Sequence, residues 1–194
     1  DEIAGKLATT KRRMIDAPVG RLARNAVEGT LLFMVGGSES DLEHARPLLD
    51  LLGDKIVHCG SVGMGSRMKI VNNYQSTSLN VLTAETLTLA EASGLDVNLA
   101  IEVMRETTAG RGHMNATYPD QVLSGNIKPG FMIDLAHKDL GLALETMAKH
   151  HTPAFLGAAA RQSYSIAQSS GQGRNDWTAI YLTLRKIAGL EPSK

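Results

Sequence analysis

The chain changes character at one stretch, Gly63-Met64-Gly65-Ser66-Arg67-Met68-Lys69-Ile70-Val71-Asn72-Asn73. Short apolar runs alternate with a helical pattern before this stretch, and after it the pattern stays helical. Residues three and four positions apart share a face of a helix, so Lys69 and Asn73 are expected to project together, with Asn72 on the same turn. An ammonium can donate a proton to a developing alkoxide, and an amide can orient the substrate beside it. The stretch therefore predicts a crossing between domains and the chemical part of a carbonyl-reducing site.

The part before this stretch is expected to be α/β. Strands are predicted over residues 14–19, 30–35 and 55–59, with a helix capped by Ser38 between the last two. A strand, a helix and a strand in that order are typical of a βαβ unit. Three strands are few for a stable doubly wound sheet, so residues 1–62 are interpreted as the C-terminal end of such a sheet. The chain begins at Asp1 in what reads as the tail of a helix, and we expect it to be cut from something longer.

The part after the crossing is expected to be all-α. A stretch without Pro or Gly from about residue 66 to residue 93 predicts one long helix that stops at Gly94. Its many small Ser, Thr and Ala residues favour close helix approach, which indicates a central place in a helical bundle. Further helices are predicted after Asp96, over 134–150 and 154–169, and over 177–187 with Asn175 or Asp176 as the cap.

The overall composition narrows the function. Lys plus Arg and Asp plus Glu are equal at 20 each, so the net charge gives no reason to expect nucleic acid or an anionic membrane as a partner. No run approaches the eighteen apolar residues of a membrane span. The single cysteine, Cys59, cannot form an internal disulfide, which fits a reducing compartment and predicts a cytoplasmic location. The six histidines show no metal-ligand spacing, so no metal site is expected.

Three local patterns carry the site prediction, and each has an ordinary alternative. The glycines from Gly60 to Gly65 do not fit a phosphate loop, because no Lys-Ser or Lys-Thr pair follows them. They do not fit a dinucleotide fingerprint either, because its third glycine would fall at Met68. Arg21, after Pro18 and Gly20, could clamp an anion, although an ordinary surface arginine is the slightly favoured reading and Arg24 is a weaker rival. Near the other end of the chain, Lys138 and Asp139 follow Phe131 and could equally form an exposed, ion-rich first helical turn.

Four motifs together resemble the β-hydroxyacid dehydrogenases, the family of 3-hydroxyisobutyrate dehydrogenase. They are Asp16 to Val19, the strand from Gly29 to Gly37, the helix start from Gly63 to Asn73, and Lys138 to Leu140, in matching order and spacing. The resemblance implies an NAD(P)-dependent oxidoreductase that acts on a small anionic aldehyde or hydroxy acid. Residues 1–62 would be the C-terminal part of its Rossmann-type NAD-binding domain. Residues 63–194 would be an all-α substrate-binding and dimerisation domain of a homodimer or homotetramer.

The resemblance also assigns residues. It implies that Lys69 is the catalytic lysine, that Asn73 with Asn72 orients the substrate, and that Lys138 with Phe131 contacts the cofactor. NAD(H) is expected more than NADP(H), without a metal. The family's amino-terminal glycine fingerprint has no counterpart in this sequence, so the chain by itself is expected to bind the cofactor poorly and to be inactive.

One loop departs from the common family pattern. Where most members continue Val-Ser-Gly-Gly, this chain has Val19-Gly20-Arg21-Leu22, and a guanidinium suits a tetrahedral oxyanion such as a sulfonate. The loop resembles that of the branch that reduces 3-sulfolactaldehyde to 2,3-dihydroxypropane-1-sulfonate with NADH in sulfoglycolysis. That resemblance implies a substrate pocket lined by Gly20, Arg21, Asn72, Asn73, Tyr74, Gln75 and Ser76. Two alternatives stay open: a carboxylated semialdehyde of the succinic or methylmalonic type as substrate, and, for this fragment alone, a non-catalytic helical dimerisation module.

Overall fold

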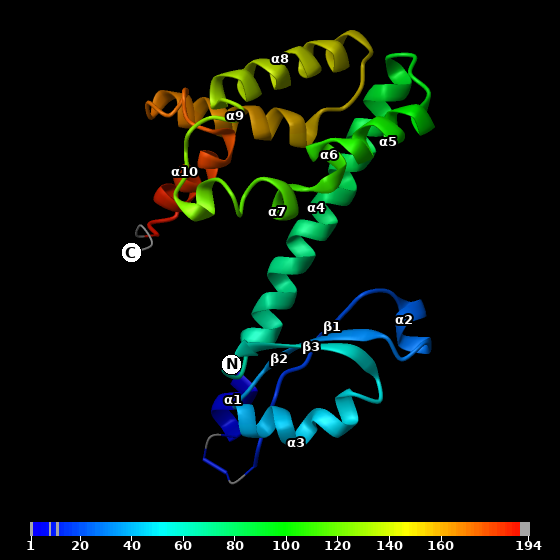
Figure 1. Ribbon diagram of the computed structural model, residues 1–194, viewed down its shortest axis with the longest axis vertical. Coiled ribbons are helices and arrows are strands. Elements are labelled where there is room, and N and C mark those ends of the chain that lie inside the picture. Colours follow the sequence, from blue (N-terminus) through cyan, green and yellow to red (C-terminus); the bar gives the residue numbers. More distant parts are fainter. Residues whose placement is uncertain (1, 8, 11, 191–194) are drawn as a thin grey trace. The chain divides into compact units, whose positions relative to one another are not determined.

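The chain forms two compact units, Asp1–Leu79 and Asn80–Lys194. The computed structural model describes residues 2–7, 9–10 and 12–190, and the side chains of Tyr74, Thr77 and Ala116 lie outside that description. All strands of the described residues belong to the first unit, while the second is helical (Figure 1). Helix α4, Met64–Ala92, begins in the first unit and ends in the second. A small sheet followed by a mostly helical remainder is the predicted combination.

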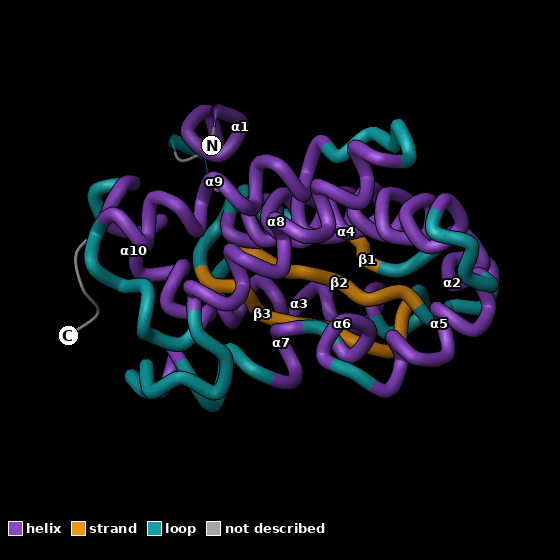
Figure 2. Tube along the Cα trace, turned by 90° about the horizontal axis from the view of Figure 1, so that it is seen from above, coloured by secondary structure: helices purple, strands orange, loops and turns teal. Residues whose placement is uncertain are grey.

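The first unit is built on a three-stranded sheet in the order β1-β2-β3. Its strands are Val19–Gly20, Leu31–Gly36 and Gly53–Gly60. β2 and β3 are parallel, with Phe33 opposite Ile56, and Figure 2 shows them side by side. Helix α3, Glu39–Leu49, connects them and lies against one face of the sheet (Figure 1). The predicted βαβ unit is therefore present. Two short helices complete the unit, α1 (Glu2–Leu7) and α2 (Ala23–Val27).

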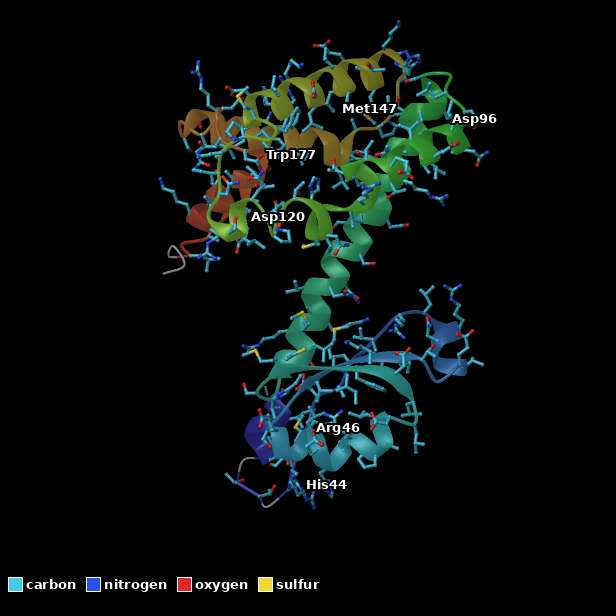
Figure 3. The ribbon with its side chains drawn as sticks, viewed as in Figure 1. His44, Arg46, Asp96, Asp120, Met147 and Trp177 are labelled. Carbon is cyan, nitrogen blue, oxygen red and sulfur yellow. The ribbon has the colours of Figure 1, made fainter. Side chains whose placement is uncertain are left out.

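The core of this unit lies between α3 and β2. The buried side chains are those of Phe33, Val35, Leu42 and Leu49. Burial of each such side chain contributes about 1.5–3 kcal/mol to stability. Ser38 caps α3 as predicted, because its Oγ accepts the backbone N–H of the residue three positions later at 3.1 Å. Helix α3 also carries polar side chains, among them His44 and Arg46, which are labelled in Figure 3.

The strand predicted over residues 14–19 is wrong in its extent. Only Val19 and Gly20 form a strand, antiparallel to β2, and Asp16 makes an isolated bridge to Gly36. Pro18 explains the interruption, because proline has no N–H to donate to a ladder. Its carbonyl still accepts the Met34 N–H at 3.0 Å, so the segment lies along β2 without forming a continuous strand.

The second unit begins with the C-terminal part of α4. Gly94, with φ of 78°, ends this helix as predicted, and the Asp96 side chain (labelled in Figure 3) caps α5, Val97–Glu106, by accepting the Leu99 N–H at 2.9 Å. Short helices α6 (Thr108–Arg111) and α7 (His113–Ala116) and a 3₁₀ turn, Val122–Ser124, follow. The periodicity did not predict these short elements, which are separated by Gly112 and by a loop with Pro119 and are too brief to show a repeat.

Two antiparallel helices, α8 (Ile133–Lys149) and α9 (Phe155–Ser169), follow in this unit. The hydrogen bond between His137 Nε2 and Ser165 Oγ, at 3.0 Å, joins them. Both lie within one residue of the predicted ranges. The helix predicted over 177–187 instead starts as a 3₁₀ turn, Trp177–Ala179, and becomes α10 at Ile180–Ile187. Of the two candidate caps, Asp176 is the cap, since its carboxylate accepts the N–H of the turn.

Candidate active site

The first functional segment is the loop 16–21, which crosses the end of the sheet. The backbone N–H of Asp16 donates to Gly36 O at 2.9 Å, and Gly36 N–H donates back to Asp16 O at 2.8 Å. Gly20 is buried, and a Cβ placed there would lie 3.2 Å from the Met34 Cε. The loop is therefore held along β2 at both its beginning and its end.

The glycines before α4 let the helix approach the sheet closely. Gly60 and Gly63 have φ of 115° and 94°, which glycine adopts without strain. A Cβ on Gly65 would meet backbone atoms: Met34 O, Gly36 N at 2.9 Å and Asp16 O at 3.0 Å. The predicted crossing from sheet to helix is thus a tight one, in which the first turn of α4 rests directly on β2.

The carboxylate of Asp16 binds the start of α4. Its Oδ1 accepts the Gly63 N–H and its Oδ2 accepts the Ser66 N–H, both at 2.6 Å. Burial by itself would raise the pKa of Asp16, but these hydrogen bonds and that of the Ser66 side chain outweigh it and lower the pKa. This contact was not predicted from the sequence. The available signal was a helix start without a capping side chain of its own, between glycines.

Lys69 lies one turn further along α4 and contacts the same loop. Its Nζ donates to Val19 O at 2.7 Å, and the side chain is only partly exposed. The structure thereby brings together two predicted features, the lysine of α4 and the loop that carries Gly20 and Arg21. A lysine ammonium has three N–H donors, so two remain that can donate to a substrate oxygen.

The amides after Lys69 are on the open surface of α4. Asn72 Nδ2 donates to Asn73 Oδ1 at 3.3 Å, and both side chains are exposed. Gln75 and Ser76 are exposed as well, while the side chain of Tyr74 lies outside the described residues. Asn73 follows Lys69 by four positions, so the two share a helix face. The amide and the ammonium can therefore address one substrate.

Arg21 has a strained backbone and an ionic partner. Its φ is 72°, which non-glycine residues rarely adopt. Its Nη1 donates to Thr30 O and to Asp54 Oδ1, each at 2.5 Å. The guanidinium is thus held at the start of β2 and β3. The side chains of this ion pair are 36% and 51% exposed, and exposed pairs contribute little, so an anionic ligand can compete for the arginine.

The two predicted cofactor-binding residues lie in the second unit. Lys138 is exposed, and its Nζ is 3.0 Å from Asp139 Oδ1, an exposed neighbour that leaves the ammonium open to other anions. Phe131 meets the Trp177 ring edge to face, with centroids 5.1 Å apart. These two rings line a pocket of about 430 Å³ together with Thr108, Thr117, Gln121, Gly130 and Asp176. Figure 3 labels Trp177 within this unit.

A buried carboxylate organises that pocket. Asp176 is 1% exposed and accepts hydrogen bonds from Gly130 N, Phe131 N, Thr178 N and Thr178 Oγ1 at 2.6–3.3 Å. Burial would raise its pKa, but these bonds outweigh burial and lower it. Tyr164 and Trp177 pack against the same buried cluster, and burial raises the pKa of Tyr164 to about 12. Asp176 therefore fixes the backbone around Phe131, and neither acid is poised to exchange protons near neutral pH.

The described part of the chain contains no group of three or more His, Cys, Asp or Glu side chains that could hold a metal ion. None of its helices is long and apolar enough to cross a membrane.

Two family models match the chain over consecutive ranges. Residues 63–184 match the NAD-binding domain of NADP-dependent 3-hydroxyisobutyrate dehydrogenase, and residues 1–60 match the NAD-binding domain of 6-phosphogluconate dehydrogenase. The chain is 45% identical over 190 residues to 3-sulfolactaldehyde reductase of Escherichia coli (strain K12). The aligned region covers 98% of this chain and 64% of that protein. The chain thus spans less than two thirds of the length of this curated relative.

Solved structures show the same likeness. The 3-hydroxyisobutyrate dehydrogenase of Mycobacterium tuberculosis, solved with L-serine, is 34% identical with a TM-score of 0.55, over 95% of this chain and 65% of that one. An imine reductase variant from Myxococcus stipitatus, solved with NAD+, has a TM-score of 0.85 at 15% identity, over 94% and 65% of the two chains. The latter comparison supports the fold alone.

Proposed function

Because the chain belongs to the 3-hydroxyisobutyrate dehydrogenase-like β-hydroxyacid dehydrogenases, we propose that the complete protein is an NAD(P)-dependent reductase of a small anionic aldehyde, with Lys69 as its proton donor. The observation that carries this proposal is the hydrogen bond from Lys69 Nζ to Val19 O at 2.7 Å. It holds an ammonium between helix α4 and the loop that would bind the substrate.

We propose 3-sulfolactaldehyde as the substrate and 2,3-dihydroxypropane-1-sulfonate as the product. The 45% identity to a 3-sulfolactaldehyde reductase and the arginine at position 21 support this choice. Arg21 would bind the sulfonate, with Gly20 providing close backbone approach, after displacement of Asp54 from the exposed ion pair. Asn72 and Asn73 would orient the carbonyl, and Tyr74, Gln75 and Ser76 would complete the pocket.

On this chain the nicotinamide cofactor would be held by Lys138 and Phe131. The residues fit this group in part: an exposed ammonium can bind a phosphate or ribose oxygen, and an aromatic ring at a pocket wall can cover an apolar ring face. The bound cofactor, NADH in our proposal, supplies the hydride. Lys69 would supply the proton to the developing alkoxide, and this proton transfer needs no metal ion.

The domain division 1–62 and 63–194 also remains our proposal. One family model ends at residue 60 and the next begins at residue 63, which supports this boundary, and α4 would be the central scaffold of the helical domain. The cytoplasmic location inferred from the single cysteine stays a prediction.

A homodimer or homotetramer formed by the helical part is the second element of the proposal. An apolar groove of about 540 Å³ in the second unit supports it, since Leu95, Leu99, Val103 and Leu142 line it and are 55–57% exposed. A groove of this kind is typical of an interaction surface, and a second copy of the chain is the partner we propose for it. The same groove favours the alternative that this part of the chain serves assembly alone.

Substitution of Lys69 distinguishes the proposed reductase from a chain that serves assembly alone. In the complete protein Lys69→Ala should lower kcat about 100-fold or more, because general acid catalysis contributes about 10²–10⁴ in rate. The KM for NADH should stay nearly unchanged. Lys55→Ala, at an exposed lysine of β3, is the matched control. Unchanged turnover in Lys69→Ala, with an intact oligomer, would leave only the assembly role.

A further inference from the structure

The start of α4 is held by a residue far away in sequence. Gly63 N and Ser66 N are among the helix N–H groups that have no partner within the helix, and both donate to the Asp16 carboxylate, 47 and 50 positions earlier. A negative charge at this position also interacts favourably with the helix dipole. One carboxylate that binds Gly63, directly before the helix, and Ser66, in its first turn, restrains both the position of the helix along its axis and its rotation.

A second contact joins the same loop and the same helix. Lys69 follows Ser66 by three residues on α4, and Val19 follows Asp16 by three residues in the loop. The hydrogen bonds Asp16–Ser66 and Val19–Lys69, at 2.6 and 2.7 Å, therefore join the same loop to the same helix at two places. The loop itself is fixed to β2 through the paired hydrogen bonds of Asp16 with Gly36. A shift or rotation of the first turn of α4 would move the lysine away from the Val19 carbonyl.

We propose that Asp16 is a positioning residue for Lys69: by binding Gly63 N–H and Ser66 N–H it sets the place of the ammonium relative to the substrate loop. This inference rests on the proposed function of Lys69. It adds that the capping carboxylate contributes to turnover as well as to stability. Displacement of a reacting group by about 1 Å can cost about 100-fold in rate.

The backbone near Asp16 is closely packed, so we expect no other group of the loop to replace its carboxylate as the acceptor of the two N–H groups. A Cβ on Gly36 would meet the Asp16 carboxylate, Ser61 O at 2.8 Å and Gly65 N at 2.9 Å, so β2 packs closely against the acid and the helix start. A water molecule that replaced the carboxylate could accept the same N–H groups but would not be attached to the loop. Loss of the acid should therefore loosen the geometry even where the helix persists.

The test compares Asp16→Ala, Asp16→Asn and the control Asp120→Asn, an exposed aspartate of the second unit, in the complete protein. Asparagine is as good a cap as aspartate, so Asp16→Asn should fold. Gly63 N–H and Ser66 N–H each donate to a different oxygen of Asp16, and in Asp16→Asn one of these oxygens becomes an NH₂ group, which is a donor and cannot accept. The readouts are kcat and KM, hydrogen exchange of the peptide that contains Gly63 and Ser66, and the rate at which an amine-acylating reagent labels Lys69 relative to the exposed Lys6.

We expect faster exchange of that peptide and faster labelling of Lys69 in both variants, largest in Asp16→Ala. The value of kcat should fall about 10-fold in Asp16→Asn and about 100-fold in Asp16→Ala, with less than about a threefold change in KM. Accelerated exchange with unchanged labelling and kcat would overturn the proposal, since Asp16 would then be a cap only. Unchanged exchange would overturn it as well. Labelling needs no turnover, so it decides the role of Asp16 even if Lys69→Ala proves fully active, a result that would contradict the proposed function alone.

Discussion

The close contact between the start of α4 and β2 predicts that a glycine-to-alanine substitution destabilises the protein at Gly65, whereas the same substitution stabilises it at Gly5. Gly65 and Gly5 both lie in helices, where alanine is intrinsically favoured over glycine by about 1 kcal/mol. At Gly5 an added Cβ meets nothing within 4 Å, so Gly5→Ala should stabilise the protein by up to about 1 kcal/mol. At Gly65 it would meet three backbone atoms, with Gly36 N at 2.9 Å and Asp16 O at 3.0 Å.

Backbone atoms cannot rotate away as a side chain can, so the helix start itself has to move off β2. Overpacking costs about 1–3 kcal/mol, and the upper end applies where backbone has to move. The gain of about 1 kcal/mol in helix propensity offsets part of this cost, which leaves Gly65→Ala destabilised by about 2 kcal/mol. The assay is urea unfolding followed by circular dichroism at 222 nm, with Gly5→Ala as the matched control. An equal or higher stability of Gly65→Ala would refute the close contact between α4 and β2, and with it the geometry given for Lys69.

Three further outcomes follow from the contacts. Arg21→Ala should raise the KM for a sulfonated aldehyde at least about tenfold and that for an uncharged aldehyde hardly at all, as loss of a charge-assisted hydrogen bond costs about 1.5–3 kcal/mol; equal effects in steady-state kinetics would remove Arg21 from the pocket. The pKa of Asp16 is lower when folded than its ordinary value, so its stabilising contribution is complete above about pH 4 and is lost as pH falls through the folded pKa. Stability measured against pH should therefore fall less steeply below pH 4 in Asp16→Asn, and an identical slope would argue against the two hydrogen bonds. Leu99→Asp together with Val103→Asp should lower the molar mass measured by light scattering, whereas an unchanged mass would exclude the groove as the interface.

Features set by neighbouring residues could be predicted from the sequence. The Ser38 and Asp96 caps and the Gly94 stop were correct because each depends on residues within one helical turn. The prediction for residues 14–19 failed at Pro18, since strand propensity competes there with the missing N–H. The helix expected from Trp177 begins as a 3₁₀ turn, a difference in hydrogen-bond pattern that periodicity over three residues cannot show.

The contacts that build the candidate site are of another kind. Asp16 binds residues 47 and 50 positions away, Lys69 binds a carbonyl 50 positions away, and Arg21 binds Asp54. No local pattern encodes such pairs, because only the fold decides which loop meets which helix start. Residue types could suggest that Lys69 is a proton donor and that Arg21 binds anions, but they could not reveal which groups hold these side chains in the folded chain.

The loop 16–21 separates two tasks within six residues. Asp16 holds the helix start through its side chain, whereas Val19 receives the lysine through its backbone carbonyl, which every residue type provides. The positions that would contact the substrate anion, Gly20 and Arg21, come after both contacts. Substitution at residue 21 can therefore change which anion is bound without removing either hydrogen bond that places Lys69. We expect substrate range in this protein to change at positions 20 and 21, and proton transfer to be sensitive at position 16.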